Sequence, residues 1–77
     1  MLRKFFDVVK DKTFRMIVEI NTINIINYTD IVTFDEEEII IKTNEKMLKI
    51  KGKNLIIDKL LQDEVLVSGE ITKIELI

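Results

Sequence analysis

Two alternating runs that each end in glycine are the feature that most constrains this chain. Residues 48–52 (LKIKG) are echoed seventeen residues later by residues 65–69 (VLVSG), and Gly52 and Gly69 are the only glycines in the sequence. Side chains that alternate in twos lie on opposite faces of a β-strand. A glycine that closes such a run permits a bulge, a bend or a positive φ. We therefore expect Gly52 and Gly69 to be structural turn positions.

The rest of the sequence favours a single all-β domain over residues 13–77. Fifteen isoleucines against four phenylalanines, one tyrosine and no tryptophan is a balance typical of β-rich chains. Short alternating segments separated by turn signals predict a small antiparallel meander, either a roll or a two-layer sandwich. A solenoid is the rival interpretation, but two copies of a repeat are too few to bury a continuous core.

The pattern also predicts where individual strands end and which residues form the core. Lys53-Asn54 predicts a turn between strands at 47–51 and 55–60, and residues 65–68 and 71–77 read as two further separate strands. The expected core comprises Phe14, Met16, Val18, Ile39, Ile41, Leu48, Ile50, Leu55, Ile57, Val65, Val67, Ile74 and Leu76.

Residues 1–12 differ from this pattern and predict a short amphipathic helix. Leu2, Phe5, Phe6 and Val9 recur at the spacing of one helical stripe. This helix is expected to cover an open part of the sheet. The alternative is that it contacts an anionic membrane surface or a groove on a partner.

Composition excludes several classes of function. The 77 residues contain no cysteine and no histidine, so there is no thiolate, no imidazole base and no usual zinc ligand set. We expect neither an enzyme nor a cofactor nor a metal site. The acidic run 35–38 is contiguous and has no glycine nearby, unlike a calcium loop, and a solvated loop is the expected interpretation. A formal charge of −2 argues against nucleic-acid binding, and no apolar run is long enough to span a bilayer.

Two candidate surfaces remain. A lysine set could face an anionic partner or lipid head groups, although a solvated sheet face is the simpler interpretation; it comprises Lys46, Lys49, Lys51 and Lys53. Apolar residues at outward-facing positions, together with the N-terminal stripe, form a candidate interface that comprises Leu2, Phe5, Phe6, Ile17, Ile40, Ile56 and Leu66. We expect a homo-oligomer or a complex with a membrane-protein partner to cover it, because the core of so short a chain is thin.

Several segments together resemble the YabP/YqfC family of sporulation proteins. These segments are residues 32–35 (VTFD), 39–43 (IIIKT), 48–57 (LKIKGKNLII), 67–71 (VSGEI) and 74–76 (IEL). The resemblance covers about residues 13–77. Two positions depart from the family pattern: Lys46 stands where a glycine is expected, and the start of the pattern is reduced to Phe14-Arg15.

The resemblance implies a small non-enzymatic protein made during endospore formation. It would act in the cytoplasm of the mother cell, with the forespore membrane surface as a candidate location, as an assembly or adaptor module in building the spore cortex or coat. The alternative function is a peripheral membrane-surface or lipid-binding module that uses the N-terminal helix and the lysine-rich face.

Overall fold

The computed structural model describes residues 13–77, which form six β-strands. The strands are β1 (Arg15–Val18), β2 (Thr22–Ile26), β3 (Tyr28–Phe34), β4 (Glu38–Thr43), β5 (Met47–Leu60) and β6 (Glu64–Leu76). The prediction of an all-β, antiparallel domain is confirmed. The predicted helical segment 1–12, with Leu2, Phe5 and Phe6, lies outside the described residues.

All six strands belong to one open sheet in the order β1-β2-β6-β5-β4-β3. Every neighbouring pair is antiparallel. The expected meander is correct only from β3 to β6. The chain does not pair β2 with β3. Instead β2 pairs with β6, and β3 forms the opposite edge of the sheet. Sequence periodicity identifies strands but carries no information on which strand lies beside which.

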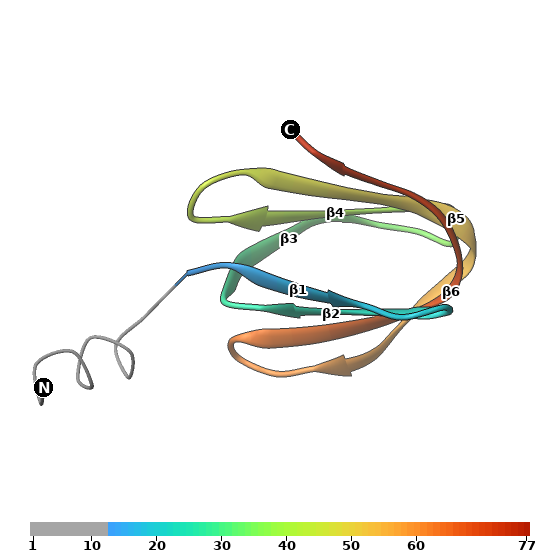
Figure 1. Ribbon diagram of the computed structural model, residues 1–77, viewed down its shortest axis with the longest axis horizontal. Helices are drawn as coiled ribbons and strands as arrows, with labels where there is room; N and C mark the ends of the chain where they lie inside the picture. The colour runs from blue at the N-terminus through green and yellow to red at the C-terminus, as the bar shows by residue number, and fades with distance from the viewer. Residues whose placement is uncertain (1–12) are drawn as a thin grey trace, which may run out of the picture.

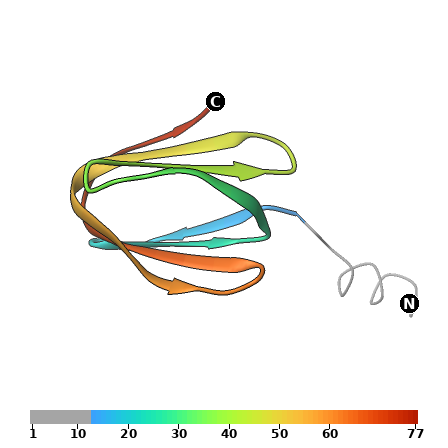
Figure 2. The ribbon, with the colours of Figure 1, turned by 180° about the vertical axis from the view of Figure 1, so that it is seen from behind.

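Because β5 and β6 are long and bend in the middle, the sheet folds over as two layers (Figures 1 and 2). Residues 48–51 of β5 pair with residues 73–76 of β6, and residues 56–60 of β5 pair with residues 65–68 of β6. The upper layer therefore contains β3, β4, the first half of β5 and the second half of β6. The lower layer contains β1, β2, the first half of β6 and the second half of β5.

The predicted turn at Lys53-Asn54 is wrong, since the chain bends there and continues as one strand, β5. Residues 65–68 and 71–76, which were predicted as two strands, likewise belong to one strand, β6.

The core lies between the two layers. Its fully buried apolar side chains in the described part are Ile23, Ile25, Ile39, Ile41, Leu48, Ile50, Leu55, Val65 and Val67. Seven of these were expected, and Ile23 and Ile25 of β2 complete the set. Val18 and Leu76 were expected in the core but are 53% and 48% exposed. Both lie on strand segments, β1 and the second half of β6, that pair on one side only within residues 13–77.

The two glycines lie at the fold between the layers, where β5 and β6 cross closely. A Cβ atom on Gly52 would clash with the carbonyl oxygen of Glu70, and one on Gly69 would lie 2.7 Å from the carbonyl oxygen of Asn54. Gly69 also has a φ of 134°, which a side chain rarely permits. Asn54 takes a φ of 55° in the left-handed region that Asn tolerates well, and the next residue, Leu55, enters the core. Both glycines are therefore required by close backbone approach.

Each glycine corner is held by a hairpin loop from its own layer. The Gly52 amide donates to the carbonyl of Glu37, in the β3–β4 loop, at 3.1 Å. The Gly69 amide donates to the carbonyl of Asn21, in the β1–β2 loop, at 3.0 Å. The same contact thus occurs twice, about an approximate two-fold axis between β5 and β6. The seventeen-residue echo is the sequence signature of this local symmetry rather than of a solenoid.

We predict that Gly69→Val lowers the melting temperature, because a valine there must adopt a strained φ and pushes against the backbone of Asn54. Strain of this kind costs roughly 1–3 kcal/mol, and each kcal/mol corresponds to roughly 4–8 °C in a domain of this size. Gly52→Val should be at least as damaging, because its obstacle is the backbone oxygen of Glu70. Ser68→Val, on the outer face beside the corner, is the matched control and should melt near wild type. Thermal unfolding measures all three, and wild-type melting temperatures for both glycine variants would contradict the close approach.

Candidate interaction surfaces

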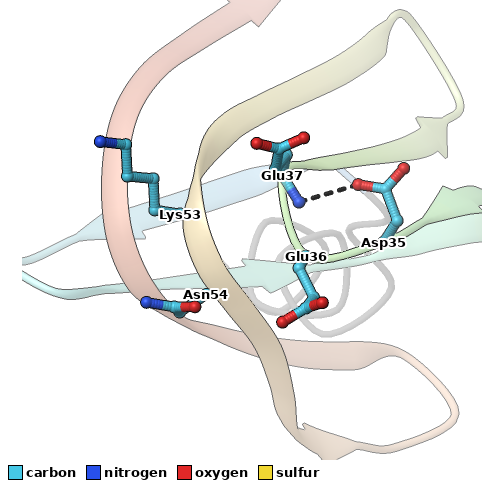
Figure 3. A pocket seen from close by; sticks show the side chains of 5 residues that line it. All are labelled: Asp35, Glu36, Glu37, Lys53 and Asn54. Atoms are coloured by element: carbon cyan, nitrogen blue, oxygen red, sulfur yellow. Dashed lines mark hydrogen bonds between the residues drawn. The ribbon is translucent and has the colours of Figure 1, made fainter.

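The acidic loop is a structural turn. The Asp35 carboxylate accepts hydrogen bonds from the amides of Glu37 and Glu38, each at 2.8 Å, and the Asp35 amide donates to the carbonyl of Glu38. The carboxylates of Asp35, Glu36 and Glu37 point in different directions, and the Lys53 side chain points away from them (Figure 3). Within residues 13–77, no three acidic side chains gather in a group that could hold a metal ion. The loop serves the fold through its backbone, because Glu36 and Glu37 supply carbonyls to Leu55 and Gly52.

The hollows on the described part are open and do not assemble reactive groups. One lies beside the acidic loop and is lined by Asp35–Glu37, Lys53 and Asn54. Another lies at the end where β2 leads into β3, and there the Tyr28 hydroxyl donates to the carbonyl of Leu61 at 2.7 Å. The single serine, Ser68, is half-buried on the outer face of the lower layer, between Thr22 and Ile56.

The structure splits the predicted lysine set. Lys49 and Lys51 share the outer face of the upper layer, where Lys49 lies opposite Glu75 and Ile40, and Lys51 lies opposite Glu38 and Lys73. Lys46 lies in the β4–β5 turn, where its carbonyl accepts from the Thr43 hydroxyl at 2.6 Å. Lys53 lies beyond the glycine corner, opposite Glu70. The outer face of the upper layer is thus a mixture of lysines and carboxylates.

The structure also separates the apolar residues expected to face outward. Ile17 and Leu66 lie on the outer face of the lower layer, one on each side of Asn24, and Ile56 lies on the same face opposite Ser68. Ile40 lies on the outer face of the upper layer, opposite Lys49. The four residues do not form one patch, because the bend in β5 and β6 turns the two outer faces in opposite directions.

Asn24 is a polar residue on this lower face that the sequence pattern does not single out. Its amide nitrogen donates to the Glu64 carboxylate at 2.8 Å. Its amide oxygen is buried and has no hydrogen-bond partner among the described residues. The sequence pattern gives no sign that this side chain lies between the apolar side chains of Ile17 and Leu66.

The most distinctive surface feature follows the open edges of the two layers. Within residues 13–77, two strand segments in each layer have a neighbour on one side only: β3 and the second half of β6 in the upper layer, and β1 and the second half of β5 in the lower layer. The large apolar side chains exposed in the described part lie on these four segments or directly after them: Ile17, Val18, Ile20, Val32, Phe34, Ile56, Leu60, Leu61, Leu76 and Ile77. This concentration became visible only with the strand order, since an edge strand and a central strand can share one alternating pattern.

Comparison with known proteins assigns the family. The model of the YabP family matches residues 12–77, which include the whole described part, and this confirms the resemblance seen in the sequence. No curated protein matches the chain. No helix in the described part is long and apolar enough to cross a membrane. The chain therefore belongs to the YabP family, a membership that indicates a sporulation-related protein.

Proposed function

We propose that this protein is a non-enzymatic assembly or adaptor module that acts in building the spore envelope, the cortex or the coat. The observation that carries the proposal is the gathering of exposed apolar side chains along the open sheet edges. An open edge offers backbone N–H and C=O groups to an added strand, and apolar side chains beside it add burial to that pairing. Family membership supplies the sporulation context.

The chemistry of the chain supports a role in assembly rather than catalysis. Histidine and cysteine are absent from the sequence, and Ser68 lies on an outer sheet face between Thr22 and Ile56, where neither neighbour is a base. The partner in this proposal is a second copy of the chain or a membrane protein. The location in this proposal is the mother-cell cytoplasm, at the surface of the forespore membrane.

The lysines on the outer face of the upper layer favour a second candidate, the peripheral membrane-surface module. Lys42, Lys49, Lys51 and Lys73 all occupy this face by register. Glu38 and Glu75 lie among them, directly opposite Lys51 and Lys49. Interleaved carboxylates weaken the attraction to anionic lipid, which depends on an uninterrupted cluster of basic groups. We therefore rank this function second.

We predict that deleting the gene in its spore-forming host leaves vegetative growth unchanged and produces spores with a defective cortex or coat. Electron microscopy of spores and their resistance to heat and lysozyme are the measurements. Restoring the wild-type gene should restore the envelope, and a Ser68→Val copy should do so equally well as a matched control. Normal spores from the deletion strain, or expression confined to growing cells, would contradict the proposed function.

The membrane alternative makes a separate prediction. We expect the purified full chain not to co-sediment with vesicles that contain phosphatidylserine at physiological salt, because acidic groups interrupt its lysine face. Strong sedimentation that Lys49→Glu with Lys51→Glu abolishes, while Lys59→Glu on the other layer leaves it intact, would favour the membrane module instead.

A further inference from the structure

The second half of β6, residues 71–76, is an open edge with a defined set of free backbone groups. Among the described strands only β5 pairs with it, since β2 pairs with residues 64–68. Met47 and Ile77 exchange two hydrogen bonds, of 3.1 and 2.8 Å, so they form a hydrogen-bonded antiparallel pair. Because such pairs alternate along a ladder, the N–H and C=O groups of Lys73 and Glu75 also point toward β5. The N–H and C=O groups of Ile74 and Leu76 therefore point away from β5, within the plane of the sheet, toward its open edge.

This edge is complementary to itself in one register. A two-fold axis at Ile74 places the Ile74 residues of two copies opposite each other, as a hydrogen-bonded pair that uses the free groups. It also places Lys73 of each copy directly opposite Glu75 of the other, at the closely spaced non-hydrogen-bonded positions. An axis at Lys73 or at Glu75 would instead place like charges opposite each other.

The charges within one copy leave Lys73 poorly compensated. Lys73 lies directly opposite Lys51 on β5, which is an unfavourable pairing of like charges. Its ion pair with Glu75 is long, at 3.8 Å, and the Lys73 side chain is 60% exposed. Charged residues on an edge normally prevent pairing with other strands. Here the register centred on Ile74 would give each Lys73 a cross-strand carboxylate from the second copy.

The apolar groups at the two ends of this edge also match. Leu76 and Ile77 are 48% and 65% exposed at one end. At the other end, residues 71–74 line an open hollow together with Val18, Glu19 and Ile20, and Ile20 is 90% exposed. In the register centred on Ile74, Leu76 of the second copy lies opposite Thr72 and Ile77 opposite Ile71. Leu76 and Ile77 of each copy therefore lie beside the hollow that residues 71–74 line in the other copy.

We propose that two copies of this chain pair through the second halves of their β6 strands, antiparallel about a two-fold axis at Ile74. The upper layers of both copies then form one continuous sheet. This inference rests on the proposed function of an assembly module and names the partner, a second copy, and the surface that it uses. The other three open edges stay available for further partners.

Charge exchange tests the register. Lys73→Glu places two carboxylates opposite each other twice in the dimer, and Glu75→Lys places two ammonium groups opposite each other twice. Sedimentation equilibrium of the purified full chain at about 100 µM should show a dimer for wild type and association weakened roughly tenfold or more for each single variant. Mixing the two variants should restore the dimer, because every pair across the axis is then Lys with Glu. The double variant Lys73→Glu with Glu75→Lys should dimerise alone for the same reason.

Lys59→Glu, the same charge change on the second half of β5, is the matched control and should leave the dimer unchanged. Circular dichroism establishes that each variant is folded. Amide hydrogen exchange gives a second readout, since the Ile74 and Leu76 amides should exchange slowly in the dimer and quickly in the single variants. A monomeric wild type, single variants that dimerise like wild type, or a mixture that stays monomeric would overturn the proposal. These outcomes concern the purified protein, so they are distinct from a deletion strain with normal spores, which would refute the envelope function alone.

Discussion

The close crossing of β5 and β6 at Gly52 and Gly69 is the constraint on which the rest of the structure depends. Without it, two long strands and their neighbours would make a flat sheet with two solvated faces and no core. The fold at the glycines brings Ile50 of the upper layer and Val67 of the lower layer into one interior. The absent side chains matter because the carbonyls of Glu70 and Asn54 occupy the space that a Cβ would need. The hydrophobic gain of the whole domain therefore rests on a backbone contact that only glycine permits.

The corner also explains why the two hairpins lie where they do. Residues 35–37 and 19–21 are loops of unlike composition, one strongly acidic and one not. Both nevertheless place a carbonyl against a glycine amide at the corner. An amide turned away from its own ladder at a bend needs a partner, and each loop provides one. The acidic side chains of the β3–β4 loop are consequently free to face water, and the Asp35 carboxylate closes the turn through its two amide bonds.

The sequence was most informative about the alternating runs at this corner and least informative about which strands lie beside each other in the sheet. The alternation around Leu48, Ile50, Val65 and Val67 placed these side chains in the core, because burial on one sheet face imposes a period of two. The pattern could not show that residues 53–54 bend the chain without reversing it, since a bulge and a turn use the same polar and glycine residues. Nor could it show that Ile40 and Ile17 face opposite sides. That separation follows from the pairing of β2 with β6, a contact between residues about forty positions apart that no local pattern encodes. The two candidate surfaces were assembled without knowledge of the strand order. The fold therefore places the members of the lysine set, and those of the apolar set, on different parts of the molecule.

A small core and open edges are two consequences of one architecture. Folding a single sheet over itself gives each layer two strand segments with a free side, and the interior between the four-stranded layers holds nine fully buried apolar side chains from residues 13–77. Apolar residues on the free segments are only partly covered, as Val18 and Leu76 show. Pairing such a segment with another strand satisfies its backbone groups and adds burial where the isolated domain is weakest. An edge that matches itself in charge at Lys73 and Glu75 and in free backbone groups at Ile74 has the means to specify that pairing. For a chain with no cysteine, and so no disulfide to reinforce it, the dimer that we propose would add to stability as well as serve assembly.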